Sequence, residues 1–185
     1  MPPHVKILKE DIVDAAIRCV RRSGADAINA RSIAEELGCS TQPIFSNFTD
    51  MSELRLAVMN KADKLIREFI DREMKTGKYP EYKASGMAYI RFAKEEAELF
   101  KLLYMRDRTK DNNNVDESLF DEMKELVSLQ TGLNGEKSKM FHFEMWTVVH
   151  GLATMIATDY LSLDLDFASK VISDMYAGLK NQHGV

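Results

Sequence analysis

Apolar residues recur at helical spacing along almost the entire chain, and this periodicity limits the fold more than any other feature of the sequence. In the first such segment Ile12, Ala16, Cys19 and Val20 share one helical face, and Gly24 ends the pattern. No β-hairpin pattern and no internal repeat occurs in the sequence. The sequence therefore predicts an all-α protein of about nine helices. We expect these helices at about residues 10–22, 30–37, 41–47, 51–76, 81–94, 96–105, 118–130, 136–160 and 166–180.

The composition agrees with a helical, globular protein. Apolar residues make up 45% of the 185 residues, enough for a continuous core, whereas Gly (9) and Pro (4) are few. No segment resembles a signal peptide or is long and apolar enough to span a membrane. Two cysteines, Cys19 and Cys39, suit a reducing compartment better than a disulfide scaffold. We therefore expect a cytoplasmic protein with no membrane partner; a thiol-sensing role for Cys39 stays open.

Residues 30–49 carry the steric pattern of a helix-turn-helix. Ala34 is small where two helices would cross closely, and Gly38, four residues later, allows the positive φ of the turn between them. Asn29 is suited to capping the first of these helices and Ser40 the second. An ordinary helix-loop-helix corner would explain the same pattern when it is taken alone. The apolar contacts between the helices are expected from Ile33, Leu37, Cys39 and Ile44.

The pattern extends over residues 10–55 with no gap in spacing, through Ile12, Ala15, Ala16, Gly24, Ile33, Ala34, Gly38, Ser40, Ile44, Phe45, Asn47, Phe48 and Leu54. This run resembles the N-terminal domain of the TetR family of bacterial regulators. Farther along, Trp146, His150 and Gly151 resemble the Trp-His-Gly signature of one subgroup of TetR C-terminal domains. The resemblance implies a three-helix DNA-binding domain at 1–50, joined through a long fourth helix to a helical ligand-binding and dimerisation domain at 51–185. It also implies a homodimer that binds palindromic, double-stranded operator DNA, most commonly as a repressor.

In this interpretation the third helix enters the major groove of DNA. Gln42 can form two hydrogen bonds with adenine, Thr41 can bond a base or a phosphate, and Pro43 offers an apolar face to a thymine methyl. Ser46 is expected to point outward on the next turn. The expected DNA-binding residues are Lys9, Arg31, Ser40, Thr41, Gln42, Pro43, Phe45, Ser46 and Asn47.

Few cations are available for the phosphates. Residues 1–54 contain six Lys or Arg against eight Asp or Glu, within a chain of net charge −4. Arg31 is the main expected phosphate contact, assisted by Lys6 or Lys9 from the N-terminal arm and by backbone amides at the start of the fourth helix.

The chain departs from the usual TetR pattern at three positions, and two of these departures remove a phosphate contact. Phe45 lacks the hydroxyl of the tyrosine that the family usually has, and Met51 stands where a lysine is common. Asn47 replaces a histidine but can still donate to phosphate. Both losses predict weaker nonspecific DNA affinity.

The C-terminal half should hold the dimer contact. Residues 136–160 are apolar on more than one helical face and therefore need cover on more than one side. The TetR resemblance implies that the last two helices pair across a two-fold axis. The expected dimer residues are Val149, Leu152, Ala153, Ile156, Val171, Met175 and Leu179.

The same half is rich in aromatic and methionine side chains, which suit a pocket for a small apolar or aromatic effector. Core packing would explain any one of these residues equally well. Trp146 and His150 lie one turn apart on one helical face, so that a ligand could stack and form one polar contact. We expect a bound effector to shift the long fourth helix and change the spacing of the DNA-reading helices. The expected effector residues are Phe92, Tyr104, Met105, Met123, Phe141, Met145, Trp146 and His150.

Two other function classes fit the sequence less well. An enzyme is disfavoured because nucleophile, phosphate-loop and metalloprotease motifs are absent, and no pattern predicts a catalytic residue, a metal site or a cofactor. A helical ligand-binding or protein-interaction module that has lost specific DNA binding is the stronger alternative, because the N-terminal domain is acidic.

Overall fold

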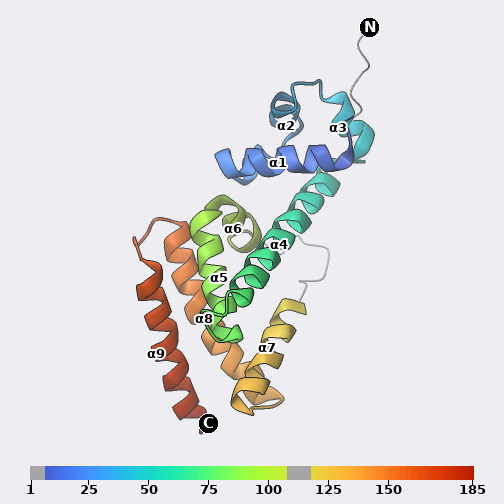
Figure 1. Ribbon diagram of the computed structural model, residues 1–185. Helices are drawn as coiled ribbons and strands as arrows, with labels where there is room; N and C mark the ends of the chain where they lie inside the picture. The colour runs from blue at the N-terminus through green and yellow to red at the C-terminus, as the bar shows by residue number, and fades with distance from the viewer. Residues whose placement is uncertain (1–6, 108–117) are drawn as a thin grey trace. The chain divides into compact units, whose positions relative to one another are not determined.

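The computed structural model describes residues 7–107 and 118–185, and within these ranges all regular structure is helical (Figure 1). The predicted all-α class is confirmed, and the helix ends agree with the expected ones within about three residues. The sequence did not predict the short 3₁₀-helix η1. The elements are α1 (Lys9–Ser23), η1 (Ala25–Ala27), α2 (Ala30–Glu36), α3 (Gln42–Asn47), α4 (Met51–Lys75), α5 (Glu81–Glu95), α6 (Ala97–Tyr104), α7 (Ser118–Thr131), α8 (Glu136–Ala157) and α9 (Leu165–His183).

The helices form two compact units. Unit 1 comprises the chain up to Leu65 together with Glu96–Arg106, and so contains α1, η1, α2, α3, the start of α4, and α6. Unit 2 comprises Ile66–Glu95 and Asp107–Val185, and contains the rest of α4 with α5, α7, α8 and α9. The expected functional boundary between residues 50 and 51 stays a prediction.

Helix α6 packs against α1 and η1 inside unit 1, although more than seventy residues of sequence separate α6 from α1. Arg21 of α1 donates two hydrogen bonds, of 2.8 and 2.7 Å, to the carboxylate of Glu96, which precedes α6. Gly24 has φ +76°, and a Cβ there would lie 3.0 Å from Oε2 of Glu98. Glycine therefore suits both the backbone turn after α1 and the close approach of α6.

Unit 2 is built around α5, α8 and α9, which pack against one another. Gly86 of α5 allows this approach, because a Cβ there would lie 3.3 Å from Cγ2 of Val149 on α8 and 3.7 Å from Cδ1 of Ile172 on α9. Phe92 and Phe141 are fully buried in this unit. The apolar contacts of three helices, and not intrinsic helix propensity alone, therefore stabilise unit 2.

Two tyrosine–histidine pairs join α5 to α8. The hydroxyl of Tyr82 lies 2.9 Å from Nδ1 of His142, and the hydroxyl of Tyr89 lies 2.9 Å from Nδ1 of His150. The later residue of α5, Tyr89, is paired with the later residue of α8, His150, so α5 and α8 run parallel. Burial lowers the pKa of His142 to about 4, so this imidazole is neutral near pH 7.

Among the described residues, none of the helices combines the length and apolarity needed to cross a bilayer. Within the same residues, no group of three or more His, Cys, Asp or Glu side chains is arranged to hold a metal ion.

Candidate nucleic-acid interface and effector site

Helices α2 and α3 form a helix-turn-helix with a buried apolar centre. The side chains of Ile33, Ala34 and Ile44 are buried between the helices of unit 1. The turn is closed by a 3.0 Å hydrogen bond from the Cys39 amide to the Ala34 carbonyl, and Gly38 has φ +64°. The positions of Ala34 and Gly38 thus have the steric roles that the sequence pattern predicted.

The cap of α2 was predicted correctly, whereas that of α3 was wrong. The side chain of Asn29 accepts a 2.9 Å hydrogen bond from the Ser32 amide at the start of α2. Helix α3 begins at Gln42, so Thr41 and not Ser40 holds the position before it, and Thr41 forms no side-chain cap. Ser40 and Thr41 are both exposed.

The outward face of α3 consists of Gln42, Phe45 and Ser46. The Phe45 side chain is 58% exposed. The hydroxyl of Ser46 donates a 2.9 Å hydrogen bond to the backbone carbonyl of Gln42. Pro43 is half-buried beside this face. Among the described residues, the exposed groups of 40–46 with no hydrogen bond of their own are the hydroxyls of Ser40 and Thr41 and the side-chain amide of Gln42, which lie beside the ring of Phe45. The Ser46 oxygen can still accept a bond.

The amide group of Asn47 is already used inside unit 1. Its Nδ2 atom donates to the carbonyl of Pro43 at 2.8 Å and to the carbonyl of Ile7 at 3.5 Å. Because these two bonds occupy both of its N–H groups, Asn47 holds α3 to the N-terminal arm in this structure.

The start of α4 binds the chain's own carboxylates. Oδ1 of Asp50 accepts hydrogen bonds of 2.8 and 2.9 Å from the amides of Ser52 and Glu53. The carboxylate of Glu53 accepts a 2.7 Å bond from the Thr49 amide and pairs with Lys9. The contact with Lys9, followed by the Thr49 amide, lowers the pKa of Glu53 to about 2. The expected anion site on these backbone amides is therefore wrong, because acidic side chains occupy them.

Two exposed cations of unit 1 differ from Lys9, which is paired with Glu53. Arg31, near the start of α2, and Arg55, on α4, form no ion pair with any residue in 7–107 or 118–185. Arg55 was missed by the sequence reasoning; its position one helical turn after Met51 was the available signal. Lys6 lies outside the described residues.

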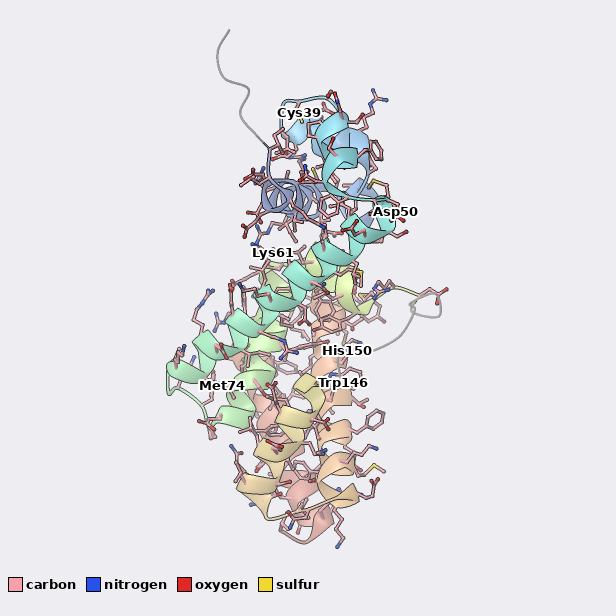
Figure 2. All side chains as sticks on the ribbon, turned by 90° about the vertical axis from the view of Figure 1, so that its right-hand side faces the viewer. Cys39, Asp50, Lys61, Met74, Trp146 and His150 are labelled. Atoms are coloured by element: carbon pink, nitrogen blue, oxygen red, sulfur yellow. The ribbon has the colours of Figure 1, made fainter. Side chains whose placement is uncertain are left out.

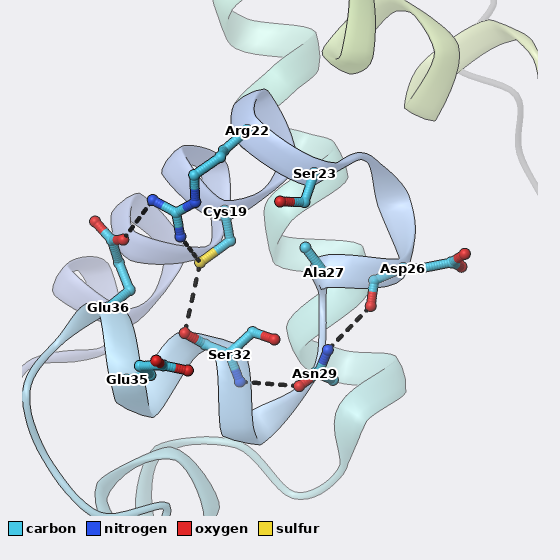
Figure 3. A pocket seen from close by; sticks show the side chains of 9 residues that line it. All are labelled: Cys19, Arg22, Ser23, Asp26, Ala27, Asn29, Ser32, Glu35 and Glu36. Atoms are coloured by element: carbon cyan, nitrogen blue, oxygen red, sulfur yellow. Dashed lines mark hydrogen bonds and ion pairs between the residues drawn. The ribbon is translucent and has the colours of Figure 1, made fainter.

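A polar groove of about 590 Å³ lies between the end of α1, η1 and α2 (Figure 3). The buried thiol of Cys19 donates to the carbonyl of Ser32 at 3.7 Å, and Arg22 pairs with Glu36 at 3.0 Å. Burial, followed by the charge of Glu36, raises the pKa of Cys19, so the group remains a thiol. Cys19 thus joins α1 to α2 as a small buried side chain.

Most of the expected dimer residues lie inside unit 2. Val149, Leu152, Ala153, Ile156 and Leu179 are buried in a single chain, whereas Val171 is half-buried and Met175 is exposed. The opposite faces of α8 and α9 expose apolar side chains, of which only Met175 was among the expected dimer residues. These are Met140, Phe143 and Met155 on α8, and Phe167 and Met175 on α9.

Two glycines lie on these outward faces. At Gly151 of α8 and Gly178 of α9, an added Cβ would meet no atom of the described residues within 4 Å. Glycine costs about 1 kcal/mol relative to alanine inside a helix. Unlike Gly86, these two glycines make no close approach to the described residues of their own chain that would require glycine.

The expected effector residues divide between the units. Phe92, Phe141, Met123 and Met145 are buried in unit 2, where Trp146 and His150 are partly exposed. Tyr104 and Met105 belong to unit 1, with the Tyr104 ring 5.1 Å from that of Phe100 and Met105 exposed.

Trp146 and His150 form a stacked pair on α8 (Figure 2). Their ring centroids are 4.9 Å apart at an interplanar angle of 20°, and the imidazole of His150 is hydrogen-bonded to the hydroxyl of Tyr89. Burial lowers the pKa of His150, which favours the neutral ring. The pair offers an aromatic surface whose polar side is fixed by a hydrogen bond.

The C-terminal half matches a family model. The model is described as "Tetracyclin repressor-like, C-terminal domain", and it matches residues 82–174, half of the chain. The chain belongs to the TetR family. No curated protein sequence matches it. The Trp-His-Gly subgroup is not distinguished by this match.

Solved structures share the TetR fold at low sequence identity. A TetR-like transcriptional regulator from Rhodococcus sp. RHA1 has a TM-score of 0.70 at 14% identity, covering 95% of this chain and 96% of its own. A TetR-family member from Streptomyces coelicolor A3 has a TM-score of 0.64 at 15% identity, covering 90% and 96%. The multidrug binding protein EbrR, complexed with imidazole, has a TM-score of 0.58 at 15% identity, covering 90% and 88%. These likenesses extend the TetR architecture to both units.

Proposed function

We propose that this TetR-family chain is a cytoplasmic transcriptional regulator that binds palindromic operator DNA as a homodimer and responds to a small apolar or aromatic effector. Repression by steric block is the proposed mode. DNA binding is assigned to residues 1–50, and effector binding and dimerisation to residues 51–185.

The exposed face of α3 is the observation that carries this proposal. Ile44 is fully buried in the helix-turn-helix, so Gln42 and Phe45 are held outward on a packed support. A helix presented in this way fits the major groove, where a glutamine amide can bond adenine. Arg31 and Arg55 supply phosphate contacts in this proposal. Ser46 and Asn47, whose polar groups are used within the chain, contribute less than the sequence suggested.

The direct test is selection of bound sequences from a library of random double-stranded DNA, followed by fluorescence anisotropy on the enriched duplex. We expect a palindromic sequence, bound by a dimer and weakened about tenfold or more by Gln42→Ala, since one good bidentate contact discriminates by about 1–3 kcal/mol. The matched control is Gln130→Ala on α7. A library with no enrichment at low salt would reject the proposed DNA binding.

The proposed dimer surface is the outward face of α8 and α9. Phe143 and Phe167 are 51% and 52% exposed, an unfavourable arrangement for a chain in water unless a partner covers them. Gly151 and Gly178 on the same faces would let two backbones approach closely. This surface replaces the expected dimer surface centred on Val149, because Val149 is buried in its own unit. Met175 and Val171 are retained from the earlier set.

The effector site is proposed around Trp146 and His150 in unit 2. An aromatic surface with a hydrogen-bonded imidazole suits a flat, apolar molecule, and EbrR, which shares this fold, is described as a multidrug binding protein. Trp146 is the only tryptophan of the chain, so its fluorescence reports directly on this site. A panel of aromatic dyes should include one that quenches Trp146 and shifts operator affinity. Dyes that quench without changing operator affinity would reject the regulatory role of the site.

The polypeptide chain links the proposed effector site in unit 2 to the helix-turn-helix in unit 1 at two places. Helix α4 continues from unit 1 into unit 2, and α5 of unit 2 leads directly into α6 of unit 1. An effector that binds one arrangement of unit 2 more tightly would shift the α3 helices of the dimer through these connections.

A helical module without specific DNA binding is the second candidate. It is favoured by the carboxylates of Asp50 and Glu53, which occupy the amides at the start of α4 and pair with Lys9. The same library selection separates the two candidates: dye binding without DNA enrichment would support this module.

A further inference from the structure

The ring of Phe45 on α3 is mostly exposed. Its side chain is 58% exposed, whereas its neighbour Ile44 and the following Phe48 fill the core. No aromatic or cation–π contact involves Phe45 among the described residues, in contrast to Phe48, which lies under Lys9 with Nζ 4.6 Å from the ring centroid. The ring is therefore available for contact outside the chain, and on the proposed recognition helix the partner it would meet is DNA.

The chemistry of the surrounding face restricts what that partner can be. The Ser46 hydroxyl donates its proton to the Gln42 carbonyl, and the Asn47 side-chain amide donates both of its protons to carbonyls of unit 1. A phenyl ring has no donor for a phosphate oxygen. The apolar group on the base edges of the major groove is the 5-methyl of thymine, which accepts contact from apolar side chains.

Gln42 and Phe45 lie three residues apart on one exposed helix face, which is about 4.5 Å along the axis. Successive base pairs are about 3.4 Å apart, so the two side chains reach the same or neighbouring base pairs. Gln42 suits adenine, and each adenine faces a thymine on the other strand.

We infer that Phe45 is a specificity-determining residue that packs against thymine 5-methyl groups, so that Gln42 and Phe45 together read A·T pairs in each half-site. This inference rests on the proposed operator binding. It assigns Phe45 to direct base recognition instead of the phosphate contact that a tyrosine hydroxyl would make.

Replacing thymine by deoxyuridine tests the inference, because only the methyl is removed and the hydrogen bonds of the base pair are kept. The probe is the duplex enriched from the random library, with each half-site thymine replaced in turn, measured by fluorescence anisotropy. For the wild-type protein we expect one or two positions at which affinity falls about fourfold per methyl. For Phe45→Ala the unmodified duplex should already bind more weakly, and the deoxyuridine effect at those positions should vanish.

Ser46→Ala is the matched control, since it changes the neighbouring exposed residue and should keep the deoxyuridine effect. Circular dichroism of both variants checks that the fold is retained. Equal deoxyuridine effects in wild type and Phe45→Ala would overturn the inference and assign the methyl contact to another side chain such as Pro43. A wild-type protein insensitive to every replacement would also overturn it. Failure of the library to enrich any duplex would instead count against the proposed DNA binding itself.

Discussion

Gly178→Ala should have opposite effects on the stability of the single chain and on the stability of the dimer. The added methyl meets no atom within 4 Å among the residues of its own chain that the structure describes, so the substitution should stabilise α9 by about 1 kcal/mol through helix propensity alone. In the proposed dimer the same methyl is placed between two closely approaching helices, once from each copy. Overpacking costs about 1–3 kcal/mol per site, hence about 2 kcal/mol or more per dimer. The dimer dissociation constant should rise about 30-fold or more.

Sedimentation equilibrium gives the dissociation constant, and urea unfolding followed by circular dichroism gives the stability of the fold. Gly151→Ala on α8 should behave in the same way. Gly86→Ala is the matched control, because its Cβ would lie 3.3 Å from Cγ2 of Val149 within the same chain. We expect Gly86→Ala to lower the free energy of unfolding by about 1 kcal/mol and to leave the dissociation constant unchanged.

The reasoning would be refuted if Gly178→Ala and Gly151→Ala raised the stability of the fold without weakening the dimer. In that case the outward glycines would not serve the close approach of helices from the two copies, and the dimer surface would have to lie elsewhere on unit 2.

Three further predictions concern charge and capping. Arg31→Gln should reduce the magnitude of the slope of log K against log salt for operator binding by about 1.8, which is about 0.9 for each of the two phosphate contacts that the homodimer loses, while Lys64→Gln should leave the slope unchanged. Fluorescence anisotropy over a salt series measures both variants, and equal slopes for the two would remove Arg31 from the interface. His142 has a pKa of about 4 in the folded chain against about 6.5 when unfolded, so the unfolded state binds the proton first and stability is lost as the pH falls from about 6.5 towards 4. The loss should reach roughly 2 kcal/mol in urea titrations at pH 7 and pH 4.5, and should shrink in His142→Gln; an unchanged pH dependence in that variant would place its origin in other groups. Asn29→Ala should cost about 1 kcal/mol of unfolding free energy by removing the cap of α2, whereas Asn29→Asp should preserve it; equal stabilities of the two variants would show that the 2.9 Å bond to Ser32 contributes nothing measurable.

The sequence alone determined the local features of this protein. Hydrophobic periodicity, caps and glycines depend on residues a few positions apart, so they predicted the helix ends, the cap at Asn29 and the turn at Gly38. The outward direction of Gln42 followed from the same local pattern, because Ile44 had to face the core.

Only the tertiary structure decided which exposed groups remain available to a partner. Helix α8 is apolar on more than one face, so periodicity could not tell which face packs on α5 and which, with Phe143 and Gly151, stays outside. Side-chain partners likewise depend on residues distant in sequence: Lys9 binds Glu53, which itself holds the Thr49 amide. The hydrophobic pattern describes the faces of one helix, whereas the contact partners of each face lie on other helices. Those partners are determined only when the whole core packs.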